Sequence, residues 1–209
     1  MTEFDELSLG RCRPFSLGRD DSKQGSFAGG LPPIEATPRF EGPRQKFFAT
    51  IVFKQFAVSI FYSFDVFEDT GGSDIIQCNN QVIFSCELIH AVLHSGSSRS
   101  TKSTIGSDMS SHCISIAEWR ADHEDDETDG VPHGGSKIGG RPYIDNENVA
   151  GPGIQKLTDL GYRQLLQFET PDPISEDFVE GFPWDPGWLH VFVAGRSFDE
   201  LEFAFLIQQ

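Results

Sequence analysis

Histidine and carboxylate side chains occur in one short stretch at a spacing that could bind a metal ion. If residues 86–94 form a helix, Glu87, His90 and His94 fall on a single face of it. A protein zinc site needs at least three such ligands in a defined geometry, usually drawn from more than one element. No other part of the chain repeats an E-x-x-H or H-x-x-x-H spacing. We therefore interpret the three residues as the polar face of a short amphipathic helix and predict no metal site.

A second candidate for cation binding is the acidic run that follows Asp122. Carboxylate oxygens are the ligands that hard cations prefer, but a calcium loop also requires Gly at its sixth position and Glu at its twelfth. Neither residue is present at these positions. We predict a solvated acidic loop, and loose binding of divalent cations remains an alternative. The run contains His123 and the acids Glu124, Asp125, Asp126, Glu127 and Asp129.

The glycine-rich residues 134–140 have the composition of a phosphate-binding loop but not its order. In a Walker A loop the lysine follows the last glycine and a helix follows the lysine. Here Lys137 precedes Gly139 and Gly140, and Pro142 prevents a helix from starting directly afterwards. We expect the glycines to form a turn with positive φ and an extended segment to start at Pro142. No cofactor is predicted.

The nucleophiles of the chain show no diagnostic arrangement. There is no G-x-S-x-G elbow, and the four cysteines show no C-x-x-C spacing. We therefore expect a protein without enzymatic activity. A divalent-metal-dependent enzyme built on His90, His94 and the acids of residues 122–129 is a third class of function, ranked behind the adaptor considered below.

The net charge of −16 is concentrated in one region of the sequence. Residues 1–56 carry 7 acids and 8 bases, whereas residues 118–185 carry 16 acids and 5 bases. Such a field repels nucleic acid, whose affinity for proteins depends largely on Lys and Arg, and it attracts cationic partners. We predict no nucleic-acid binding and a basic protein as the partner.

The chain has no predicted membrane segment. The acidic residues at positions 3, 5 and 6 do not fit a secretory signal, and Lys54 and Gln55 interrupt the most apolar window. We expect a cytoplasmic protein with reduced cysteines.

Apolar runs separated by Gly, Pro, Asn and Ser predict an α+β fold, mainly antiparallel β-sheet with a few short helices. Four regions are expected: an irregular N-terminal arm (1–46), a β-rich half that ends in a short helix (47–94), a Ser-rich loop (95–111) and a C-terminal half (112–209). The β-rich half, the Ser-rich loop and the C-terminal half are also compatible with one continuous domain over 47–209.

Four motifs fill the last third of the chain: residues 136–143 (SKIGGRPY), 165–169 (LLQFE), 184–193 (WDPGWLHVFV) and 203–208 (FAFLIQ). Their order and spacing over residues 134–209 resemble the YwqG-like family, bacterial proteins known as a domain of unknown function. The resemblance implies a fold of two related halves, of which only the second matches here. It also implies a place beside the polymorphic and secreted toxins of competing bacteria.

Together these features predict an immunity protein that binds a cognate toxin, such as a basic nuclease effector of a secretion system, in a one-to-one complex. The stretch from 169 to 188 combines carboxylates with aromatic residues, of which we expect Trp184 and Trp188 to be core. An adaptor for another cationic protein is the alternative. The acids predicted to block the active site of the toxin are Asp125, Asp126, Glu127, Asp129, Asp172, Glu176, Asp177 and Glu180.

Overall fold

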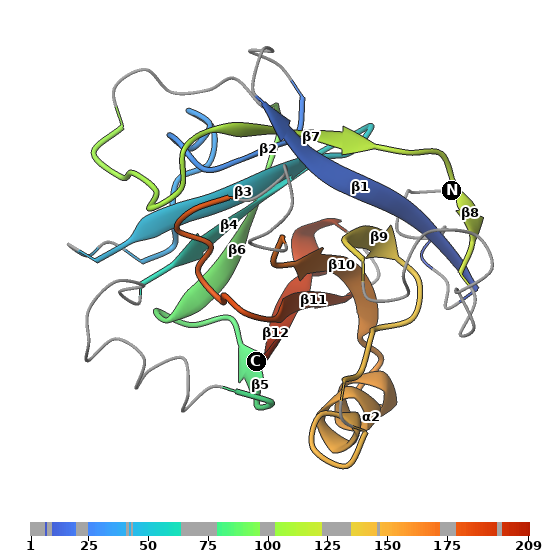
Figure 1. Cartoon of the computed structure of the whole chain (residues 1–209). Coiled ribbons are helices and arrows are strands. Elements are labelled where there is room, and N and C mark those ends of the chain that lie inside the picture. The colour runs from blue at the N-terminus through green and yellow to red at the C-terminus, as the bar shows by residue number, and fades with distance from the viewer. Residues whose placement is uncertain are drawn as a thin grey trace.

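A single β-sheet of twelve strands organises the part of the chain that the computed structural model describes. Every pair of named strands in it runs antiparallel. The sheet curls into a nearly closed barrel, with one α-helix below it (Figure 1). The described residues are 7, 10–19, 25–40, 42, 44–63, 79–96, 103–122, 135–145, 147–171, 179–195 and 198–209.

The strands are distributed over the whole described chain. In the first half they are β1 (Arg11–Arg19), β2 (Phe27–Ala28), β3 (Lys46–Val52), β4 (Ala57–Tyr62), β5 (Val82–Phe84) and β6 (Ile89–His94). In the second half they are β7 (His112–Ile116), β8 (Arg120–Ala121), β9 (Lys137–Gly139), β10 (Arg163–Glu169), β11 (Trp188–Ala194) and β12 (Glu202–Gln208). The helix α2 (Gly151–Asp159) precedes β10, and the 3-10 turn η2 (Phe198–Glu200) precedes β12.

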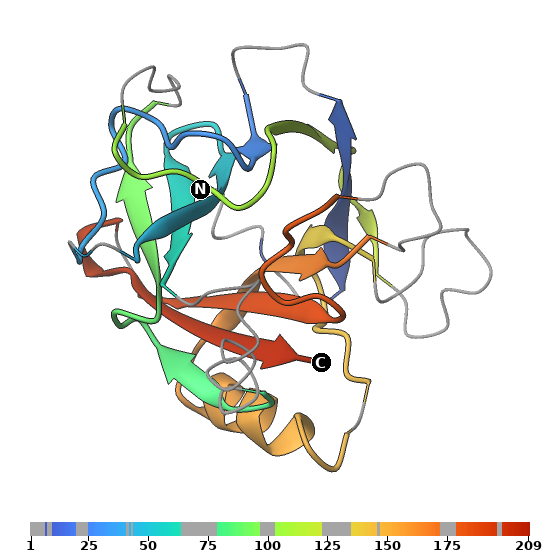
Figure 2. The same cartoon turned by 60° about the vertical axis from the view of Figure 1, so that its left-hand side comes forward.

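The spatial order of the strands interleaves the two halves of the sequence. The order is β5-β12-β11-β10-β9-β1-β7-β2-β3-β4-β6, and β8 pairs with β1 beside β7. The outermost strands β5 and β6 follow each other in the chain and are separated only by residues 85–88. The two ends of the sheet therefore approach each other at this connection, as Figure 2 shows from another side.

This architecture corrects the predicted fold class. The described chain is mainly β rather than α+β, and its strands form one sheet rather than two related halves. The helix predicted for residues 86–94 is wrong, because Ile89–His94 of this range form the strand β6. The residues of β6 are covered on both faces, and in such a segment the sequence pattern of a helix is hard to distinguish from that of a strand. The arm predicted as irregular over residues 1–46 contains β1, which lies in the middle of the sheet.

The barrel encloses a core of aromatic residues. In β11 and β12, alternate residues such as Leu189, Val191, Phe203 and Phe205 face this core, as the two-residue period of a strand requires. Residues 179–187 pass into one end of the barrel, where the fully buried Trp184 packs against Phe48 with 4.2 Å between ring centroids. Trp184 is thus confirmed as a core residue.

The outer face of β11 and β12 is covered by α2. Ile154 and Leu157 of the helix pack on Phe192 and Leu206. A Cβ atom at Gly153 would lie only 3.2 Å from the side chains of Leu206 and Val82, so the glycine allows the helix to approach the sheet. No helix among the described residues has the length and apolar character needed to traverse a lipid bilayer.

Candidate interaction site at the rim of the barrel

Most of the acids predicted to bind a partner lie outside the described residues. These are Asp125, Asp126, Glu127 and Asp129 of residues 123–134, and Asp172, Glu176 and Asp177 of residues 172–178. Glu180 is described and is exposed in a turn between the buried residues Val179 and Gly181. The residues that flank each acidic segment, which we call its anchors, are described, so the structure shows where each segment joins the barrel.

The two acidic segments join the sheet next to each other. The first segment ends just before Ser136, and the second begins two residues after Thr170. The backbone N–H of Glu169 donates a hydrogen bond to Oγ of Ser136 over 2.9 Å, and Gln167 is paired with Lys137 across β10 and β9. Eight acids therefore belong to two segments that each have one end at this point of the barrel: Glu124, Asp125, Asp126, Glu127, Asp129, Asp172, Glu176 and Asp177.

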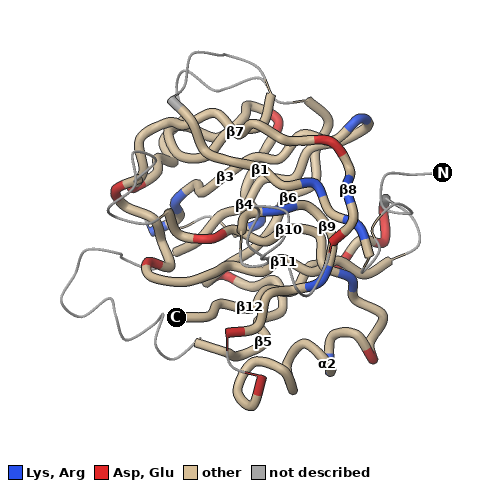
Figure 3. Tube along the Cα trace, turned by 45° about the vertical axis from the view of Figure 1, so that its right-hand side comes forward, with Lys and Arg blue, Asp and Glu red and all other residues tan. Residues whose placement is uncertain are grey.

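The excess negative charge of the chain does not reside in the described barrel. Of 32 acidic residues 18 lie outside the described residues, whereas only 4 of the 16 basic residues do. In the described trace, acidic and basic positions are interspersed (Figure 3). The barrel is therefore a nearly neutral scaffold, and the two acidic segments together carry half of the net charge of −16.

Two aromatic side chains are held at this rim. The rings of Tyr143 and Trp188 lie 4.8 Å apart at an interplanar angle of 47°, and both residues are partly exposed. Trp188 occupies the outer face of β11, in alternation with the core residue Leu189, so the prediction that Trp188 is a core residue is wrong. Part of the surface of both residues is therefore exposed to solvent beside the end of β10.

Buried glutamines fix the backbone that carries Tyr143. The N–H of Tyr143 donates to Oε1 of Gln167 over 2.9 Å, and its carbonyl accepts from Nε2 of Gln208 over 2.8 Å. Both glutamines are almost fully buried, and each makes a further hydrogen bond, Gln167 to Gly135 and Gln208 to His190, that fixes its side chain. Residues 143–145 are thereby bound to the outer face of the sheet, and Tyr143 is held in a defined position.

Two carboxylates border the Tyr143–Trp188 pair. Glu169 lies directly opposite Trp188 in the β10–β11 pairing, and burial raises the pKa of its carboxyl group. Burial also raises the pKa of the Tyr143 hydroxyl, and the nearby carboxylates of Asp145 and Glu169 raise it further. Among the described residues, no Lys or Arg forms an ion pair with Glu169. A half-buried carboxylate beside two rings is an environment that favours a cation.

A buried ion pair supports the turn that leads to Tyr143. Nζ of Lys137 lies 3.1 Å from Oδ1 of Asp122, and the N–H of Arg141 donates to Oδ2 of Asp122 over 2.6 Å. Gly139 and Gly140 have φ values of 67° and 77°, which confirms the predicted turn. A Cβ atom at Gly140 would collide with Asp122, so this position requires glycine. Lys137 therefore has a structural role in the motif of residues 136–143.

His190 continues the buried polar row beneath this surface. Its Nε2 lies 2.5 Å from Nε2 of Gln208, and burial, followed by the charge of Lys137, lowers its pKa to about 3. The imidazole is therefore neutral at physiological pH and accepts the Gln208 bond. Its role is to hold Gln208, which in turn holds Tyr143.

The residues considered for metal binding do not come together. In β6, the fully buried His90 stacks on Phe61 with ring centroids 5.4 Å apart, whereas Nε2 of His94 bonds Oγ of Ser59 over 2.8 Å. Burial and the charge of Arg39 lower the pKa of His90 to about 4. The described residues contain no group of three His, Cys, Asp or Glu side chains arranged to hold a metal ion. Residues 123–129 lie outside this part of the chain.

Tyr143, Glu169, Gln167 and Gln208 were not among the predicted site residues. The glutamines carry a weak signal in the sequence, since Gln167 interrupts the apolar residues 165–168 and Gln208 directly follows the apolar run 203–207. The proximity of Tyr143 to Trp188 depends on the path of residues 139–145 over the sheet, which no local pattern encodes. Comparison with known proteins identified no matching family model, no matching curated protein and no matching solved structure.

Proposed function

We propose that this chain is a cytoplasmic immunity protein that binds a cognate bacterial toxin, a basic nuclease effector, and blocks its active site. The observation that carries the proposal is the hydrogen bond between Glu169 and Ser136, because it joins the anchors of the two acidic segments. Eight carboxylates that start from one rim can act on a partner together.

The physical basis of the proposal is charge complementarity on a neutral scaffold. A nuclease presents a cationic groove for phosphates, and clustered carboxylates can occupy such a groove. Charge of this kind mainly raises the association rate and selects the partner, whereas affinity depends on a few buried contacts. The Tyr143–Trp188 pair, which is partly exposed at the same rim, supplies aromatic surface for such contacts.

Co-expression with the neighbouring gene tests the proposal. If the chain is an immunity protein, the product of the adjacent gene should arrest growth when expressed alone, and this chain should restore growth. The two proteins should form a one-to-one complex that weakens at high salt. A harmless neighbour, or toxicity that this chain does not relieve, would contradict the proposal.

A further inference from the structure

We infer that Tyr143, Asp145, Glu169 and Trp188 form a receptor for one arginine side chain of the partner, which we call the arginine receptor. The inference deepens the proposed function and rests on it for the identity of the partner. The four residues come from the connection before α2, the end of β10 and the start of β11. They join at the rim where the acidic segments are anchored.

The rings provide the first part of the receptor. Tyr143 and Trp188 present two aromatic faces at an angle of 47°. Aromatic faces attract cations, and Trp does so more strongly than the other aromatic residues. Because hydrogen bonds to Gln167 and Gln208 hold the backbone of Tyr143, little conformational entropy is lost when a ligand binds.

The carboxylates provide the second part. Glu169 is half-buried, lies opposite Trp188 and forms no ion pair within the described chain. Asp145 is exposed beside Tyr143, and its N–H donates to Oε1 of Gln208 over 3.2 Å. A cation at this position would compensate the buried charge of Glu169. The nearby Lys137 cannot do so, because its ammonium group is buried against Asp122.

The chemistry favours arginine over lysine. A guanidinium group is planar, stacks on aromatic rings and can donate two parallel hydrogen bonds to a carboxylate. An ammonium group is compact and more strongly hydrated, and it gains less from a ring face. A ring pair with an unpaired carboxylate fits the first group better.

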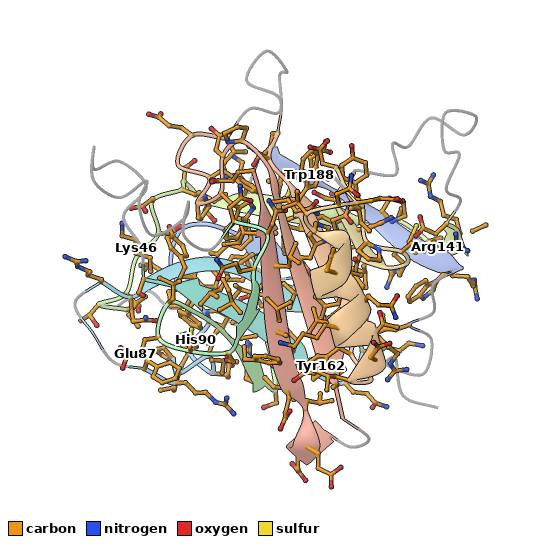
Figure 4. The ribbon with its side chains drawn as sticks, turned by 90° about the horizontal axis from the view of Figure 1, so that it is seen from below. Lys46, Glu87, His90, Arg141, Tyr162 and Trp188 are labelled. Carbon is orange, nitrogen blue, oxygen red and sulfur yellow. The ribbon has the colours of Figure 1, made fainter. Side chains whose placement is uncertain are left out.

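The opposite end of the same strands provides a matched control. Tyr162 donates to Oε2 of Glu202 over 3.2 Å and contacts Phe84 with 6.0 Å between ring centroids. This cluster also contains a tyrosine, a second ring and a carboxylate, but its carboxylate already has a partner. Figure 4 shows Tyr162 far from Trp188, with the length of the strands between them.

The experiment uses the full chain and a short neutral peptide that contains one arginine, with a citrulline peptide of the same sequence as the uncharged control. The indole N–H signals are followed by NMR. The arginine peptide should shift the Trp188 signal saturably, and the citrulline peptide should not. Glu169→Gln should weaken binding about tenfold, whereas Glu202→Gln should leave it unchanged. Equal shifts with both peptides, or an unaltered affinity of Glu169→Gln, would overturn the arginine receptor.

Because the peptide assay needs no toxin, it separates this inference from the proposed function. Saturable arginine binding that Glu169→Gln weakens would support the receptor even if the neighbouring gene is harmless. Conversely, relief of toxicity by the wild-type chain and by Glu169→Gln with the same complex affinity would uphold immunity and overturn the receptor. Retention of the wild-type unfolding transition in both variants excludes misfolding as the cause of either result.

Discussion

The backbone N–H of Glu169 donates to Oγ of Ser136 over 2.9 Å, and this bond connects the ends of two strands that each border an acidic segment. The bond therefore places a described residue just after the first acidic segment beside one just before the second. Glu169 is also the cross-strand partner of Trp188. The proposed function and the arginine receptor therefore depend on the same described residues.

Reversing the charge of Asp125, Asp126 and Glu127 to Lys should slow association with a basic partner without unfolding the protein. The association rate at low salt should fall by about tenfold or more, because electrostatic steering is lost. Stopped-flow kinetics at two salt concentrations measure this effect. The control is the same reversal at three exposed acids elsewhere, Asp159, Asp199 and Glu200. Equal effects of the two triple variants would show that net charge, not this segment, determines the rate.

Trp184→Ala and Trp188→Ala should differ strongly in stability. Trp184 is fully buried among Phe48 and Phe182, so its removal should lower the free energy of unfolding by about 3–5 kcal/mol. Trp188 is only partly buried, and its removal should cost about 1–2 kcal/mol. Urea denaturation with an unchanged slope measures both values. A loss at Trp188 as large as that at Trp184 would place Trp188 in the core after all.

Lys137→Met should destabilise the protein by about 3–5 kcal/mol, because it leaves the buried Asp122 carboxylate without its counter-charge. The double variant with Asp122→Asn should be more stable than the single variant, since the uncompensated charge is then removed. Thermal unfolding of the two variants checks the order. If the double variant is the less stable one, the ion pair is not what Lys137 contributes.

Acidification should destabilise the protein through His90. Its pKa is lowered from 6.5 to about 4 in the folded protein, so below pH 6.5 the unfolded chain takes up the proton first. Stability should therefore fall as the pH decreases from 6.5 to 4, by about 3 kcal/mol from this residue. His90→Phe, which keeps a ring stacked on Phe61, should reduce the pH dependence of the unfolding free energy in this range. An unchanged dependence would contradict the assignment.

The last third of the chain was predictable because its strands alternate between a core face and an outer face. In β12, Phe203, Phe205 and Ile207 face the core and are separated by residues that face α2. By contrast, β1 was missed because it contains three arginines and Pro14, which lacks an N–H group. The carbonyl of Pro14 still accepts a bond from Ala117 over 2.8 Å, so the strand tolerates the proline.

The candidate site could be predicted only in part. Composition alone identifies the acidic region, since residues 118–185 contain 16 acids but only 5 bases. The adjacency of their anchors depends on the register between β9 and β10, where Gln167 meets Lys137. Register is a long-range property that depends on the whole sheet, so local patterns do not reveal it.

Recovery of the tagged chain from its native cell at low and at high salt tests the central claim most directly. An immunity protein should bring down one stoichiometric basic protein at low salt, which is lost at high salt and is toxic when it is expressed alone. The same recovery with Asp125, Asp126 and Glu127 changed to Lys should yield less of it. No partner, several unrelated partners, or a partner retained equally at both salt concentrations would contradict an immunity protein that acts through its acidic rim.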